Sequence, residues 1–236
     1  MEENLVHQRT VTAEEAEELQ RAFVVKVYGW MMAGLLVTGI MSLLTMNTPG
    51  LLELLFSSRW TVIGLFVVQL GLVGWLSVRI EQMSAATATT VFIGYAALTG
   101  LTLSAIFLVY TAESLASTFF VTAGTFGAMS AYGYITKRDL TGFGSFLMMG
   151  LIGMIIASVV NMFLQNSMVY WISTYIGIFI FVGLTAYDTQ KIKNMSGAAL
   201  MGSEVEQKGA IMGALRLYLD FINLFLLLLR VLGRRR

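Results

Sequence analysis

The chain has 236 residues, of which 57% are hydrophobic and only 12% are charged. A soluble domain carries about a quarter charged residues, so this composition indicates a membrane protein. The net charge of +1, without a dense basic face, argues against nucleic acid as a partner. The chain has no cysteine, which excludes a disulfide-stapled or zinc-thiolate protein.

Residues 1–22 are predicted to be an acidic leader on the cytoplasmic side of the membrane. No small-residue cleavage site precedes the first apolar run, so we do not expect a removable signal peptide. Thr12 and Glu15 have the spacing of a capping box, which predicts a short helix over 12–22. Residues 23–236 are then expected to form a single membrane domain.

Long uncharged intervals separate the charged clusters, and each interval is long enough for spanning helices of about 20 residues. The first span is predicted over 24–46, and it ends at Asn47-Thr48-Pro49-Gly50, where the only proline marks a turn. Further spans are expected at about 60–78, 86–110, 114–136, 143–164 and 168–187. Six spans therefore precede the last apolar segment.

The last segment, 210–232, is interrupted by Arg216, Asp220 and Arg230. Each central charge costs about 2.5–3.5 kcal/mol on insertion scales, so its hydropathy alone makes it a marginal span. It can be a helix surrounded by the other six or a re-entrant segment, and in both cases its polar face should avoid lipid. We expect an all-α integral membrane protein with seven transmembrane helices; the alternative is six spans plus a re-entrant C-terminal segment.

The distribution of Lys and Arg predicts a cytoplasmic N-terminus. In that orientation nine basic residues lie on the cytoplasmic side, against Arg59 alone in the opposite loops. The nine are Arg9, Arg21, Lys26, Arg79, Lys137, Arg138, Lys191, Lys193 and Lys208. The tail, Arg230 with the arginines at 234–236, conflicts with this rule if the last segment crosses, whereas a re-entrant segment keeps it inside.

The motifs of soluble enzymes, such as GxSxG, HExxH, the P-loop and CxxC, are missing from the sequence. The lone His7 lies in the leader, where we expect it to be solvated. Without a nucleophile–base pair or a ligand cluster, we expect neither enzyme activity nor a bound cofactor. Small-residue spacings predict close helix packing at Ala96-xxx-Gly100, Ala123-xxx-Gly127 and Gly209-xxx-Gly213.

Two acidic residues lie where hydrocarbon is expected. Asp188 closes the sixth span, and Asp220 lies inside the last segment. An acid inside a membrane segment predicts a functional site. The two segments are antiparallel and joined by a polar loop at about 191–209, so both acids lie within a few turns of the same end and can meet. Two carboxylates in one dry site cannot both ionise cheaply, so the pair would form a proton-sensitive latch.

Each acid also has a structural explanation. Asp188 could form an ion pair with Lys191 at headgroup level, and Asp220 could be neutralised by Arg216, four residues away on one helix face. Arg79 ends the second span at the same side of the membrane, where it is either a third partner of the acids or a snorkelling anchor. The candidate latch partners are therefore Arg79, Arg216 and Asn223.

Two segments carry a specific resemblance: Ala186-Tyr-Asp188-Thr-Gln-Lys-Ile-Lys193, and Leu217-Tyr-Leu-Asp220-Phe-Ile-Asn-Leu-Phe225. They resemble the signature of the transmembrane Bax inhibitor motif family, in particular its bacterial branch, and a weaker resemblance extends from about Tyr28 onward. The resemblance implies seven helices, with the C-terminal helix central and wrapped by the other six. It also implies a pH-sensitive calcium leak governed by a hydrogen-bonded aspartate pair, Asp188 and Asp220, with Arg79 the closest match to a latching arginine.

The resulting hypothesis is a calcium leak channel in a bacterial inner membrane, gated by the pair on helices six and seven. Calcium takes about 6 to 8 oxygen ligands, so two carboxylates would bind it weakly and release it, as conduction requires. The alternative is an interaction protein that modulates a membrane-bound protease or stress-response complex through the leader. A proton-coupled transporter would favour an inverted repeat, which the sequence does not show. The expected partners are the lipid bilayer, calcium and another membrane protein.

Overall fold

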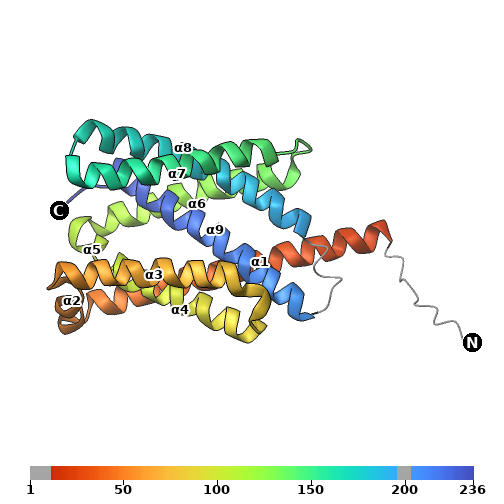
Figure 1. The fold of residues 1–236 in the computed structure, drawn as a ribbon, viewed down its shortest axis with the longest axis horizontal. Helices are drawn as coiled ribbons and strands as arrows, with labels where there is room; N and C mark the ends of the chain where they lie inside the picture. Colours follow the sequence, from red (N-terminus) through yellow and green to blue (C-terminus); the bar gives the residue numbers. More distant parts are fainter. Residues whose placement is uncertain (1–11, 196–202) are drawn as a thin grey trace, which may run out of the picture.

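The computed structural model describes residues 12–195 and 203–236, and the regular structure in these ranges is helical (Figure 1). This confirms the predicted all-α fold. The helices are α1 (Ala13–Met46), α2 (Pro49–Phe56), α3 (Arg59–Arg79), η1 (Ile80–Gln82), α4 (Ala85–Leu103), α5 (Ile106–Val109), α6 (Ala112–Ile135), α7 (Thr141–Leu164), α8 (Ser167–Asn194) and α9 (Ser203–Leu232).

Six helical stretches in the described ranges are long and apolar enough to cross a membrane. They are Glu14–Met46, Arg59–Gln82, Ala85–Val109, Thr141–Leu164, Ser167–Asn194 and Ser203–Leu232. The C-terminal segment is therefore one of the six, although its charges made it the marginal span in the sequence. The marginal helix is instead α6, whose 24 residues are rich in Ser, Thr, Ala and Gly.

The start of α1 has the predicted capping box. The Glu15 amide donates to Thr12 Oγ1 at 3.2 Å, and the Thr12 amide donates to Glu15 Oε2 at 2.9 Å. The helix then continues without a break to Met46, passing through Gly29, Gly34 and Gly39, because no proline interrupts it before Pro49. The predicted helix at 12–22 is thus the first part of a longer helix, and its start projects beyond the bundle (Figure 1). Residues 1–11, with His7, lie outside the described residues.

The C-terminal helix α9 is the centre of the bundle. It buries thirteen residues and packs against α1, α4, α6 and α8, whereas the outer helix α7 buries only Gly144 and Leu147. The expected central position of α9 is therefore what the structure shows. The other six helices were expected to surround α9, but two of them do so only indirectly: α3 packs mainly on α4, and α7 packs on α8.

Tyr218 anchors α9 against α1 and α4. Its hydroxyl lies 2.7 Å from Thr38 Oγ1, and its ring makes edge contacts with Phe92 and Tyr95. Thr38 Oγ1 also lies 2.9 Å from the Ala96 carbonyl oxygen on α4. A buried hydroxyl needs such partners, so this network fixes the rotation of α9 two residues before Asp220.

The two ends of α9 lie at opposite ends of the bundle (Figure 1). The helix has 30 residues without a break, a length of roughly 45 Å. Beyond it, the Arg236 amide donates to the Val109 carbonyl oxygen, and the Thr111 amide donates to the Arg234 carbonyl oxygen. These bonds hold the C-terminus against the α5–α6 connection. No re-entrant turn interrupts Ser203–Leu232.

Helices α6 and α8 approach closely at Gly133. A Cβ atom added there would overlap the backbone carbonyl group of Ala186, two residues before Asp188. Of the small residues predicted to allow close packing, Gly100 would place a Cβ 2.5 Å from the Thr38 carbonyl oxygen, whereas Gly127 has open space. The contact at Gly133 was not predicted, and it fixes the position of α8 near the acid.

We expect Gly133→Ala to lower the free energy of unfolding by about 1–3 kcal/mol, because backbone rather than a flexible side chain must move. Gly124→Ala is the matched control on the same helix, since an added Cβ there meets nothing within 4 Å. Removing a helical glycine should make the control neutral or slightly more stable. Unfolding of both variants in the same detergent measures the difference, and equal stabilities would contradict the close approach.

Candidate functional site

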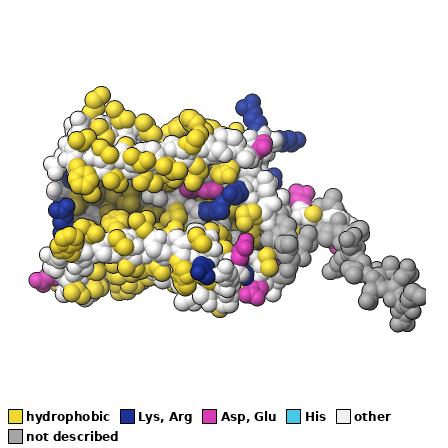
Figure 2. Space-filling view, viewed as in Figure 1, with side chains coloured by type: hydrophobic (Ala, Val, Ile, Leu, Met, Phe, Trp, Pro, Cys, Tyr) yellow, Lys and Arg dark blue, Asp and Glu magenta, His cyan; other side chains and the backbone are white. Residues whose placement is uncertain are grey.

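A cavity of about 510 Å³ lies along α9, with walls from α3, α4, α7 and α8. Most of its lining is apolar, but Asp188 from α8 and Arg216, Asp220 and Asn223 from α9 also line it. Figure 2 shows this hollow between two hydrophobic ridges, with acidic and basic side chains side by side within it. The cavity therefore brings charge into the part of the bundle that is otherwise hydrophobic.

The two predicted acids meet in this cavity. Asp220 is 4% exposed, and the side chain of Asp188 is 13% exposed. Both carboxyl groups line this cavity and lie close enough to interact electrostatically. A bond between two carboxyl groups requires a proton on one of them. Asp220 Oδ2 is buried and has no hydrogen-bond partner among the described residues, so part of this group remains unsatisfied.

Arg216 is the cation beside the pair. Its Nη1 atom lies 3.9 Å from Asp188 Oδ1, so it pairs with the neighbouring helix rather than with Asp220 on its own helix. Lys191 does not form the ion pair with Asp188 that the sequence suggested. Its Nζ atom lies instead over the Tyr187 ring, 5.7 Å from the centroid. The positive charge beside the acid pair therefore comes from Arg216 of α9, which reaches Asp188 on α8.

The other two candidate latch partners lie in different surroundings. Arg79 Nη1 donates to Gln82 Oε1 at 2.6 Å at an exposed position, and Arg79 does not line the cavity. Asn223 lines the cavity, but its Nδ2 atom donates to the Leu219 carbonyl oxygen on its own helix at 2.8 Å. Of the three candidates, the structure places Arg216 next to the acids.

Sequence reasoning missed polar side chains on the opposite wall. Gln69 on α3 donates to Thr102 Oγ1 at 2.6 Å and to the Leu98 carbonyl oxygen at 2.9 Å. Tyr95 and Thr99 on α4 line the same cavity. Gln69 is the only amide side chain in 60–78, and its presence in an apolar span could have indicated a buried polar contact.

The site offers two carboxyl groups and one guanidinium to a ligand. Among the described residues, no group of three or more His, Cys, Asp or Glu side chains could hold a metal ion. A cation at this site would therefore meet two carboxylates, beside the competing charge of Arg216, and would need water for its remaining ligands. These features define an all-helical membrane protein with an acidic pair on its central helix and on one neighbour.

The sequence pattern of the family described as inhibitor of apoptosis-promoting Bax1 matches residues 20–236. The chain belongs to this family, the Bax inhibitor-1 family. It is 54% identical over 223 residues to the inner membrane protein YbhL of Escherichia coli K12, covering 92% of this chain and 93% of that protein. An uncharacterized protein of Borreliella burgdorferi is 45% identical over 227 residues, covering 96% and 98%. An uncharacterized protein of Rickettsia prowazekii is 47% identical over 220 residues, covering 93% and 92%.

We expect the ion pair to contribute a coupling of roughly 0.5–1 kcal/mol between Arg216 and Asp188, because Arg216 is partly solvated. Arg216→Gln and Asp188→Asn should then together cost less than the sum of the single changes. Arg79→Gln is the control at an exposed position, and it should change stability by less than about 0.5 kcal/mol. Strictly additive unfolding free energies would show that the two side chains do not interact.

Proposed function

We propose that the protein is a pH-sensitive calcium leak channel of the bacterial inner membrane, gated by Asp188 and Asp220. The observation that carries this proposal is that Asp188 and Asp220, from two neighbouring helices, line one large cavity beside Arg216. The 54% sequence identity to an inner membrane protein of Escherichia coli supports the proposed location in the bacterial inner membrane.

The gate opens through repulsion between the two carboxylates. In the closed state a shared proton and the charge of Arg216 hold α8 and α9 together. Loss of that proton places two negative charges side by side where the dielectric constant is low, so their repulsion is large. The other charged or titratable groups that face the pair are Lys191 and Tyr95. Raising the pH on the side of the acids therefore favours separation of α8 from α9.

Calcium is drawn to the carboxylates that separation frees. Protons compete with it for the same oxygens, so acid lowers its occupancy while alkali opens the site. Two carboxylates hold calcium weakly, and a weakly bound ion can leave, as a leak requires. The polar side chains of Gln69 and Thr99 on the facing wall could replace part of its hydration.

The expected topology is a cytoplasmic N-terminus and seven spans, which are the six apolar stretches and, between α4 and α7, the less apolar helix α6. α6 packs against α8 and α9, and the protein around it compensates for its lower hydrophobicity. The acid pair then lies near the cytoplasmic end of the bundle, and the arginines at 234–236 lie on the far side.

A reporter fused after residue 236 should be active only on the side opposite the N-terminus, because α9 runs the length of the bundle. A pair of fusions measures this: one reporter fluorescent in the cytoplasm and one enzymatically active outside it. The same fusions at the α6–α7 connection, near Asp139, should report the cytoplasmic side. Cytoplasmic activity at both positions would reject the seven-span arrangement.

In liposomes that contain only the purified protein, calcium entry should rise with pH on the side of the acids. Asp188→Asn and Asp220→Asn should each abolish this pH dependence, and the double variant should add little, since both remove one coupled unit. Arg216→Gln should raise the flux at low pH, because it weakens the closed state. The signal is that of a calcium-sensitive dye inside the liposomes across a pH series.

Arg79→Ala is the informative comparison in this series. A flux raised by this change, and not by Arg216→Gln, would assign the latch to Arg79. No flux above protein-free liposomes at any pH would reject the channel.

The second candidate function is an interaction protein of the membrane that modulates a protease or stress-response complex. The observation that favours it is the projecting start of α1, where Glu14, Glu17 and Glu18 are exposed. A solvated acidic helix of this kind could dock on a basic partner surface.

A further inference from the structure

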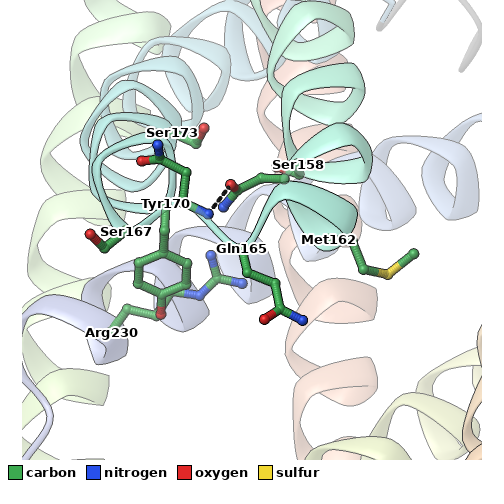
Figure 3. Close-up of a pocket in the computed structure, with 9 residues that line it drawn as sticks. Ser158, Met162, Gln165, Ser167, Tyr170, Ser173 and Arg230 are labelled. Atoms are coloured by element: carbon green, nitrogen blue, oxygen red, sulfur yellow. Dashed lines mark hydrogen bonds between the residues drawn. The ribbon is translucent and has the colours of Figure 1, made fainter.

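A second cavity lies at the opposite end of the bundle from the acid pair. It has a volume of about 460 Å³ and lies between the end of α7 and the start of α8, and Arg230 of α9, which is exposed, also lines it (Figure 3). Six of its lining side chains carry a hydroxyl or an amide on a short stem, and none is a carboxylate. The cavity is therefore polar and carries the positive charge of Arg230.

Arg230 has no anionic partner among the residues that the structure describes. Its guanidinium lies over the ring of Tyr170, 5.3 Å from the centroid, and it forms no ion pair or hydrogen bond with any described residue. Figure 3 shows it lying across Tyr170, with Ser158 and Met162 on the α7 side. The guanidinium rests against the ring, and its five N–H donors remain available.

The hydroxyl groups around Arg230 are also available. Ser158, Ser167 and Ser173 form no side-chain hydrogen bond with any described residue, although all three line the cavity. Asn166, in contrast, already accepts bonds from the Met168 and Val169 amides and caps α8. The cavity thus offers one cation and several neutral donors to a ligand with many acceptor oxygens, and a phosphate group has this chemistry.

The surroundings of the cavity identify the source of the phosphate. Trp171 makes an edge contact with Tyr170, which lines the cavity, and stacks on Tyr175. Trp171 and Tyr175 are both exposed, as aromatic residues are at a membrane–water interface. Met162, Phe163 and Leu164, at the end of α7, expose more than half of their surface. A free anion would gain nothing from these apolar side chains, whereas lipid chains would cover them.

We propose that this cavity binds the phosphate of an anionic phospholipid, with Arg230 as its main ligand and the acyl chains along α7 and α8. A zwitterionic lipid fits less well, because the cavity has no carboxylate to face its ammonium group. The arginines at 234–236, at the same end of the bundle, add positive charge and favour a lipid with net negative charge.

The experiment uses the full-length protein in detergent, with phosphatidylglycerol or phosphatidylcholine added, and counts retained lipids by native mass spectrometry. The wild type should retain phosphatidylglycerol in preference to phosphatidylcholine. Arg230→Gln should weaken that retention about tenfold, because it removes a charge-assisted hydrogen bond. Arg230→Lys should keep part of it, since the charge remains but the planar fork is lost.

Arg59→Gln is the matched control, because Arg59 is exposed at the start of α3, at the same end of the bundle, and lines no part of the cavity. Equal retention by Arg230→Gln and the wild type would overturn the proposal, as would an equal loss in Arg59→Gln. Displacement of the lipid by millimolar inorganic phosphate would assign the site to a free anion instead, and would also overturn it. Circular dichroism of each variant checks that the helices are intact.

Discussion

A carboxyl group and a guanidinium in the middle of a membrane helix need protein around them, and the arrangement of the other helices follows from this need. Asp220 and Arg216 lie on α9, and lipid could satisfy neither of them. Four helices pack directly against α9, and its exposed positions are few. Exposed large hydrophobic side chains are most numerous on the outer helices α3 and α7, and α1, α6 and α8 expose further ones.

The acid pair lies between two parts of the core. One hydrophobic cluster joins α1, α4, α6 and one side of α9, with Tyr218 among its fully buried members. A smaller cluster joins α7 and α8 to the other side of α9 through Leu184 and Leu224. Tyr218 holds α9 to the first part, and Gly133 holds α8 against α6. A change in charge at Asp188 and Asp220 therefore acts on the contact between α8 and α9, while both helices remain anchored elsewhere.

The two cavities differ in charge and in the partner they would accept. The larger contains Asp188 and Asp220 with one nearby arginine, and a proton or a cation can change its balance. The smaller contains Arg230 without an acid, and an anion can neutralise it. Both cavities are lined by α9, with Arg216 and Asp220 near the middle of this helix and Arg230 near its C-terminal end. The outer helices α3 and α7 supply apolar walls to the larger cavity, whereas the smaller one is lined mainly by polar side chains.

The sequence by itself determined the helical membrane fold, most helix boundaries and the meeting of Asp188 with Asp220. Charge spacing sets where hydrophobic helices begin and end, and two antiparallel helices joined by a short connection bring the same end of each together. Sequence reasoning also located the capping box at Thr12, because that motif depends only on residues three apart.

Only the tertiary structure decided the partners of these residues. Arg216 could reach Asp220 on its own helix or Asp188 on the next, and the rotation of α9, fixed by Tyr218, selects Asp188. Hydropathy assigned the doubtful span to 210–232 rather than to α6, because an average along one helix does not record which neighbours cover it. The close approach at Gly133 and the cavity around Arg230 both bring together segments that are far apart in the chain, so local sequence patterns do not predict them.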